Sequence, residues 1–454
     1  MKQKTASTDT QFTLAERRKV AVATMVGTTI EWYDFFIYAN SAALVFQLLY
    51  FSPAGKELSL LISFATIGLS FIFRPLGAII AGHLGDKIGR KAMLVATLML
   101  MGVATFIIGL LPTYEQIGIL APIMLIVLRI LQGISAGGEW GGAALMAVEY
   151  APTDRRGFFG AAPQIGTPIG LILATSMIGV MSLIAPGDAF LEWGWRVPFM
   201  FSIVLVIVGL VVRRTIEESP VFNKMREASE RERVPLAVLF RKHALLVVIV
   251  ALTFAGNNAL GYMTTGGFIQ NYASDPDGPV RLDRASVLFA VTVSAFFWLA
   301  ATLYGGWVSD RIGRRNSYFA GWTCLALSVF PMLAMVNSGN ILLLTIGVSV
   351  FAVGLGLSYG PQSAFFAELF PSSVRYSGVA ISYALGAILG GAFAPTIAAA
   401  LVQQTGGTTA VGVYLLGMVI VSATATFLLK DRREIPLGHE HEAEQARPPF
   451  IWNR

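Results

Sequence analysis

The chain has 454 residues, of which 55% are hydrophobic and 13% are charged, about half the charged share of a soluble globular protein. Its mean hydropathy is +0.66, which excludes a water-soluble multidomain protein, because such a chain could not bury so much apolar surface. The formal net charge of +6 does not indicate a nucleic-acid partner, because the basic residues gather in short loops between apolar stretches. A single cysteine, Cys324, excludes an internal disulfide and a metal site built from cysteines.

Twelve apolar stretches are long enough to cross a bilayer as helices, each of which needs about 20 residues. Their approximate limits are 20–50, 59–82, 92–112, 117–148, 157–184, 194–213, 244–270, 285–308, 316–336, 341–367, 376–402 and 410–429. The runs are too long, and alternate too little, for the strands of a membrane barrel. We therefore predict an all-α membrane protein with twelve transmembrane helices.

The basic residues divide unevenly between the two sides of these spans. Of the 33 Lys and Arg residues, 27 lie in the termini and the even-numbered connections, three lie in the odd-numbered connections, and three lie inside spans. Because Lys and Arg concentrate in cytoplasmic loops, both termini are predicted to be cytoplasmic.

The segment 214–243 is the only long hydrophilic segment between spans, and twelve of its 30 residues are charged. It divides the spans six and six. The predicted organisation is a cytoplasmic N-terminal segment 1–19, a six-helix bundle 20–213, a central cytoplasmic loop 214–243, a second six-helix bundle 244–430 and a cytoplasmic C-terminal tail 431–454.

Two local patterns occur once in each half. The pattern G-x-x-x-D-[KR]-x-G-R-[KR] stands at 82–91 and again at 306–315, and the pattern E-x-x-P begins at Glu149 and again at Glu368. The offsets are 224 and 219 residues, which indicates an internal duplication. We therefore expect two pseudo-symmetric bundles, with a substrate path between them near the membrane midplane.

The twelve spans, the central loop and the doubled loop motif resemble the major facilitator superfamily. The stretches 27–36, 73–77, 129–142 and 193–199 are similar to those of its metabolite:proton symporters, and within that family to carriers of shikimate and related organic acids. The resemblance implies two six-helix bundles with alternating access, in a monomer that crosses the bacterial inner membrane many times and needs no cofactor.

Two carboxylates, Glu31 and Asp34, lie in the middle of the first span, where an ionised side chain is costly and is a functional candidate by default. At 100° per residue they share a helix face with Tyr38 and Ser41, and we expect this face to line the central cavity. Asp34 is the first candidate for the proton carrier and Glu31 the second. The alternative is a carboxylate fixed by hydrogen bonds between helices.

Arg129 lies in the fourth span, with Gln132 one turn further along and Glu139 on nearly the same face. Because arginine keeps its charge, Arg129 needs an anion inside the membrane. That anion could be Asp34, Glu31, Glu139 or the carboxylate of a substrate, which a guanidinium group binds through two parallel hydrogen bonds. A permanent ion pair without substrate contact is the alternative.

The loop motifs are predicted to act at the cytoplasmic ends of the helices. The superfamily resemblance implies a gating cluster in each half, which opens and closes with the change of access. The candidate gating residues are Asp86, Arg90 and Glu149 in the first half and Asp310, Arg314 and Glu368 in the second. Charges that only orient the loops would be compatible with the same residues.

The second half has no charged residue in the middle of a span but has several neutral polar side chains. They are Asn257, Asn258, Tyr262, Thr265 and Gln270 in the seventh span, Tyr359 and Gln362 in the tenth, and Tyr383 in the eleventh. They could hold hydroxyl or carbonyl groups of a substrate, or they could bond neighbouring helices to each other.

The predicted function is a proton-coupled symporter that imports a small carboxylated metabolite, with the proton and the lipid bilayer as its other partners. A betaine or proline carrier and a dicarboxylate carrier are alternatives, and a membrane sensor is a further one. A nucleotide-binding loop, a cofactor and enzymatic chemistry are not expected. His439 and His441 in the tail could bind a metal ion, but we expect this tail to be solvated and disordered.

Overall fold

The structure is a computed structural model that describes residues 12–88, 90–214, 235–265 and 267–452, and it is almost wholly helical there. The first half contains α1 (Leu14–Ser41), α2 (Gln47–Leu49), α3 (Lys56–Ile88), α4 (Arg90–Leu110), α5 (Tyr114–Ile117), α6 (Leu120–Gly137), α7 (Trp140–Glu149), α8 (Arg156–Ile184) and α9 (Arg196–Arg214). The second half contains α11 (Pro235–Thr265), α12 (Phe268–Ser274), α13 (Arg284–Ile312), α14 (Arg314–Asn337), α15 (Ile341–Tyr359), α16 (Gln362–Leu369), α17 (Arg375–Gly390), α18 (Ala394–Thr405), α19 (Thr409–Leu428) and α20 (Glu442–Gln445). Shorter π-helical and 3-10 segments cover Ala42–Phe46, Ser52–Ala54, Thr153–Arg155, Phe190–Gly194 and His439–His441.

The helices correspond to the twelve predicted spans, which confirms the predicted fold class. Ten helical stretches in the described part of the chain are long and apolar enough to cross a membrane. The other two spans are α1, which carries several charged residues, and α4, whose shorter apolar part is Val95–Leu110. The first span continues beyond α1 through the π-helical segment Ala42–Phe46.

Several spans are interrupted, and the interruptions repeat between the two halves. The fourth span breaks between α6 and α7 at Gly138 and Glu139, and the tenth breaks between α15 and α16 at Gly360 and Pro361. The starts of α7 and α16 are 222 residues apart, and those of α4 and α14 are 224 apart. These offsets agree with those of the sequence motifs. The duplication therefore extends to the positions at which the helices bend.

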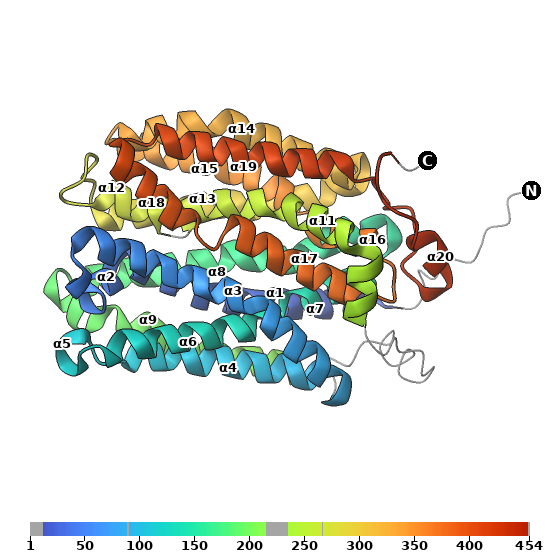
Figure 1. Ribbon diagram of the computed structural model, residues 1–454, viewed down its shortest axis with the longest axis horizontal. Coiled ribbons are helices and arrows are strands. Elements are labelled where there is room, and N and C mark those ends of the chain that lie inside the picture. Colours follow the sequence, from blue (N-terminus) through green and yellow to red (C-terminus); the bar gives the residue numbers. More distant parts are fainter. Residues whose placement is uncertain (1–11, 89, 215–234, 266, 453–454) are drawn as a thin grey trace, which may run out of the picture.

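The long helices run nearly parallel, with α4, α6 and α9 along one side of the molecule and α14, α15 and α19 along the other (Figure 1). The halves meet where α8 packs against α13 and α3 packs against α17. One end of the bundle carries α20 and the junction of α13 with α14, and α5 and α12 lie at the opposite end (Figure 1). We call the end with α20 the charged end, because Asp310, Arg314 and Glu368 meet there.

Glycine residues allow neighbouring helices to approach each other closely. A Cβ atom on Gly133 or Gly137 would collide with the backbone of α3 at Ser70 or Arg74. Small residues at helix contacts of this kind are typical of membrane proteins. The halves also touch through glycine, since a Cβ atom on Gly306 would lie 2.7 Å from the carbonyl oxygen of Gly157.

The C-terminal tail is folded, so the prediction that it is disordered is wrong. After α19 the backbone turns back, and the Lys430 amide donates to the carbonyl of Pro449 at 2.8 Å. The Gln445 amide group donates to the carbonyls of Pro436 and Gly438 and accepts from Arg375 at 2.9 Å. These contacts satisfy the polar groups of a segment that composition alone marks as solvated. Among the described residues no cluster of ligands fits a metal ion.

Candidate functional site

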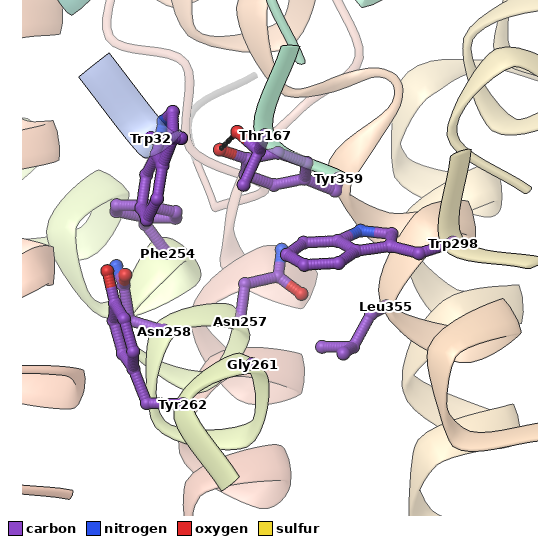
Figure 2. A pocket seen from close by; sticks show the side chains of 10 residues that line it. All are labelled: Trp32, Thr167, Phe254, Asn257, Asn258, Gly261, Tyr262, Trp298, Leu355 and Tyr359. Atoms are coloured by element: carbon purple, nitrogen blue, oxygen red, sulfur yellow. Dashed lines mark hydrogen bonds between the residues drawn. The ribbon is translucent and has the colours of Figure 1, made fainter. Parts of the chain in front are cut away.

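A small cavity lies between the two halves. Its lining residues are Trp32 and Thr167 from the first half and Phe254, Asn257, Asn258, Gly261, Tyr262, Trp298, Leu355 and Tyr359 from the second (Figure 2). Helix α11 supplies five of them, and α1, α8, α13 and α15 supply the rest. Among the side chains of this lining Trp298 is the most exposed, at 6%, so all the lining residues are buried.

Hydrogen-bond donors dominate the polar lining of the cavity. The Tyr359 hydroxyl is 3.2 Å from Thr167 Oγ1, a bond that joins the two halves (Figure 2). Within the described part of the chain, the donor groups Asn257 Nδ2, Asn258 Nδ2, Tyr262 OH and Trp298 Nε1 are buried without a hydrogen-bond partner. Buried donors are nearly always paired in folded proteins. The lining therefore suits a ligand with several acceptor oxygens.

Glu31 and Arg74 form a buried pair beside this cavity. Arg74 Nη2 lies 3.6 Å from Glu31 Oε1, and both side chains are 2% exposed. The Arg74 guanidinium lies over the rings of Phe71 and Trp32, with its central carbon 4.6 and 5.8 Å from the ring centroids. Because Trp32 lines the cavity, the pair borders the cavity from the side of the first half.

Asp34 belongs to a second polar group, inside the first half. Thr105 on α4 donates to Asp34 Oδ2 at 2.9 Å, and Gln132 Nε2 donates to Thr105 Oγ1 at 2.8 Å. Arg129 Nη1 in turn donates to Gln132 Oε1 at 2.9 Å. We call this chain of four residues the Asp34 network. It connects α1, α4 and α6, and none of its members is among the residues that line the cavity.

Arg129 is surrounded by rings as well as by the Asp34 network. Its guanidinium carbon lies 4.0 Å from the ring centroid of Tyr38 and 4.9 Å from that of Phe35. The Tyr38 hydroxyl donates to Thr66 at 2.7 Å and so faces α3 rather than the cavity. Phe35 also packs against Tyr262, with ring centroids 5.2 Å apart. Direct binding of a substrate carboxylate by Arg129 stays a prediction.

Glu139 lies at the break of the fourth span. It is 2% exposed, and its backbone carbonyl accepts from Ala143 at the start of α7. Its carboxylate is within electrostatic range of Asp34, so the first half buries three acidic side chains near one another. The predicted grouping of Glu139 with Gln132 on one face stays a prediction, although Gly138 and Glu139 keep right-handed helical backbone angles across the interruption.

An aromatic stack adjoins the cavity through Phe254. The Tyr383 ring lies 3.7 Å from the Trp140 ring and 4.4 Å from the Phe254 ring, and the three planes are nearly parallel. Trp140 belongs to the first half and the other two to the second. Gln362, at the start of α16, is fully buried. Tyr383 thus joins the halves through ring contact, a role that the sequence does not predict.

At the charged end, ionic contacts hold the halves together. Arg314 binds Glu368 through two hydrogen bonds of 3.0 and 3.1 Å and binds Asp310 at 2.6 Å. Asp310 also accepts from the backbone amides of Gly157 and Phe158, at 2.8 and 2.9 Å, at the start of α8 in the other half. The predicted gating residues of the second half therefore meet, and they reach across to the first half.

The gating residues predicted in the first half are only partly described. Arg156 of the first half lies 3.8 Å from Glu368 and so adds an ion pair between the halves. Glu149 ends α7 and lies within electrostatic range of Arg375. The side chains of Asp86 and Arg90 lie outside the described part of the structure.

The residues in and near the cavity that were not predicted as site residues include Arg74, Thr105, Trp32 and Trp298. A signal existed for Arg74, because a cation inside a span is a functional candidate for the same reason as Asp34. Trp32 directly follows Glu31 in the motif of the first span. The sequence carries no corresponding signal for Thr105 or Trp298, since threonine and tryptophan are common in membrane helices.

Comparisons with known proteins agree with this arrangement. The family model "Sugar (and other) transporter" matches residues 19–237, and the model "Major Facilitator Superfamily" matches residues 268–453. The inner membrane metabolite transport protein YhjE of Escherichia coli (strain K12) is 41% identical over 423 residues, which cover 92% of this chain and 95% of that protein. The shikimate transporter of the same organism is 37% identical over 431 residues, which cover 92% and 96%.

Solved structures show the same fold. The proton:xylose symporter XylE bound to 6-bromo-6-deoxy-D-glucose superposes with a TM-score of 0.73 and covers 91% of this chain and 95% of that chain. The sequence identity is 13%, so this likeness supports the fold alone. The two Escherichia coli relatives and this shared fold together identify the family of the chain. The chain belongs to the major facilitator superfamily and is a multi-pass membrane transporter of metabolites rather than an enzyme.

Proposed function

We propose that this transporter is a proton-coupled symporter for a small monocarboxylate with hydroxyl groups, of the shikimate type, and that it works as a monomer. The observation that carries the proposal is the buried cavity lining with its unpaired donors, with two buried carboxylate–arginine groups nearby. The name of the shikimate transporter, a relative at 37% identity, supports the same substrate class.

The Asp34 network would supply the proton coupling. In that role Asp34 takes up a proton when the substrate brings a negative charge into the protein, and the buried charge then stays balanced. Arg129 would favour the ionised form of Asp34 through Gln132 and Thr105 when no substrate is bound. Thr105 would keep a hydrogen bond to Asp34 in both states, because its hydroxyl can donate or accept.

The charged end would face the cytoplasm. The 27-to-3 distribution of basic residues supports this orientation. The bundles would then be 20–213 and 244–430, joined by the loop 214–243. Helix α11 begins at Pro235 but has a kink at His243, next to the proposed start of the second bundle.

A betaine carrier is the second candidate, and the rings of the cavity favour it. Trp32, Phe254 and Trp298 line the cavity, and aromatic faces attract quaternary ammonium groups. The unpaired donors of Asn257 and Asn258 favour an oxygen-rich acid instead.

Substrate-induced proton movement tests the proposal. Purified protein in lipid vesicles is mixed with shikimate in weakly buffered medium, and the external pH is recorded. A symporter removes protons from the medium together with the substrate, so the external pH is expected to rise, and a proton ionophore should abolish the rise. Glycine betaine serves as the competing substrate. Uptake of radiolabelled shikimate without a pH change would contradict proton coupling, and a response to betaine alone would favour the second candidate.

A further inference from the structure

Arg74 is a buried cation whose hydrogen-bonding capacity is only partly used. A guanidinium group has five N–H donors and keeps its charge in proteins. The separation of 3.6 Å between Arg74 Nη2 and Glu31 Oε1 is longer than a hydrogen bond. Nε and Nη1 of Arg74 have no hydrogen-bond partner in the part of the chain that the structure describes. Arg74 therefore has donors available for a further acceptor.

The position of Arg74 makes the cavity the source of that acceptor. Arg74 lies over the rings of Trp32 and Phe71, and these two rings are 6.3 and 5.4 Å from the ring of Tyr262. Trp32 and Tyr262 both line the cavity, and the Tyr262 hydroxyl is itself an unpaired donor. An anion at this corner of the cavity would meet donors from both halves, from α3 and from α11.

Arg129 is less well placed for the same task. One of its terminal nitrogens already donates to Gln132, and its guanidinium lies against Tyr38 and Phe35 inside the first half. Neither arginine is itself among the residues that line the cavity, and Nε and Nη2 of Arg129 also have no described hydrogen-bond partner. Of the two buried arginines, Arg74 is the one whose guanidinium lies over the ring of a cavity-lining residue, Trp32.

We propose that Arg74 is the carboxylate-binding residue of the central cavity and that Glu31 is its resident counter-ion. The inference rests on the proposed function, in which the substrate is a carboxylate. The substrate carboxylate binds the open donors of Arg74 and shares its charge with Glu31. Glu31 thus stabilises Arg74 in the empty transporter and opposes the substrate in the loaded one. The Tyr262 hydroxyl from the second half donates to the same substrate carboxylate, which links binding to the closure of the two halves.

Binding of an acid and of its uncharged ester distinguishes this role from a structural one. Detergent-purified wild-type protein, Arg74→Gln, Arg74→Lys, Glu31→Gln and Arg129→Gln are titrated with shikimate and with methyl shikimate by calorimetry. Wild-type protein is expected to prefer the acid by about tenfold or more, the usual effect of a charge-assisted hydrogen bond. Arg74→Gln should lose this preference and keep its affinity for the ester. Arg129→Gln should keep the preference.

The remaining two variants test whether a change in binding comes from damage to the fold. Glu31→Gln should bind the acid several times more tightly than wild-type protein and the ester equally well, a gain that damage to the fold cannot produce. Arg74→Lys keeps the charge but not the planar fork, so its acid affinity should lie between those of wild-type protein and Arg74→Gln. If Arg74→Gln melts below the assay temperature, the acid affinity of Arg74→Lys tests the role of Arg74 instead.

Two results would overturn the inference, and they differ from a failure of the proposed function. An Arg74→Gln protein that still prefers acid over ester would show that Arg74 does not hold the carboxylate. Loss of the preference in Arg129→Gln would assign the role to Arg129. A wild-type protein that binds neither shikimate nor other monocarboxylates of a small panel would instead refute the proposed substrate class, and this inference would fall with it.

Discussion

The contact of Asp310 with the first half gives a prediction whose size follows from the structure. The Asp310 carboxylate is 10% exposed and accepts from the amides of Gly157 and Phe158, across the boundary between the halves, and from Arg314 in its own half. A hydrogen bond to a charged group contributes about 1.5–3 kcal/mol. Asp310→Asn leaves one acceptor oxygen, so about one bond between the halves is lost. The closed state of the charged end should be destabilised by roughly 2 kcal/mol. The ratio of closed to open molecules should then fall about 30-fold.

Thiol labelling measures that population. Ser363 on α16 is fully buried at the boundary, and a Cβ atom on Gly160 of the first half would lie 3.4 Å from its Cβ. In a Cys324→Ser background, Ser363→Cys is labelled with a maleimide, and the rate follows the open fraction when opening is fast. Asp310→Asn is expected to raise the rate by about 30-fold.

Asp431→Asn is the matched control for Asp310→Asn. Asp431 accepts from the amides of Arg314 and Arg433, so its hydrogen bonds stay within the second half. Its removal should leave the labelling rate of Ser363→Cys nearly unchanged. Equal rates in Asp310→Asn and in the unsubstituted background would refute the view that Asp310 holds the halves together.

Three further predictions concern the cavity, the packing and the tail. Tyr262→Phe should lower shikimate affinity by about tenfold without lowering the melting temperature, because the hydroxyl has no described partner to lose; a clear fall in melting temperature would contradict this. Gly390→Ala should destabilise the protein by about 1–3 kcal/mol, because a Cβ atom would collide with the carbonyl of Ala255, whereas Gly417→Ala, with open space around it, should not. Glu442→Ala removes the carboxylate that binds two serines before α17 and should speed proteolysis within the tail; an unchanged digestion rate would show that the tail is held by its backbone alone.

The fold could be predicted because its signals are local. An apolar run of about 20 residues specifies a spanning helix wherever it stands, and the doubled motifs specify the duplication. The breaks at Glu139 and Pro361 were not predicted as breaks. Proline lacks an amide hydrogen and disturbs the helix locally, but Glu139 follows a run of glycines that serves helix packing as well as bending.

The candidate site was predicted only in part, because partners depend on packing between distant segments. The helical wheel places Glu31 and Asp34 on one face, yet Glu31 pairs with Arg74 on α3 and Asp34 bonds Thr105 on α4. A 60° difference around α1 is enough to direct the two side chains to different neighbours. Asn258 and Tyr262, two of the neutral polar side chains of the seventh span, line the cavity. The sequence alone could not tell such side chains from ones that bond helices to each other.

The most direct test of proton coupling through Asp34 separates exchange from accumulation. Vesicles that contain wild-type protein, Asp34→Asn or the exposed control Glu115→Gln are given a pH gradient of one unit, acid outside, and radiolabelled shikimate. One proton per substrate supplies about 1.4 kcal/mol, so wild-type protein and the control should accumulate shikimate about tenfold. Asp34→Asn is expected to exchange shikimate across the membrane but to reach no accumulation. Tenfold accumulation by Asp34→Asn would contradict the account.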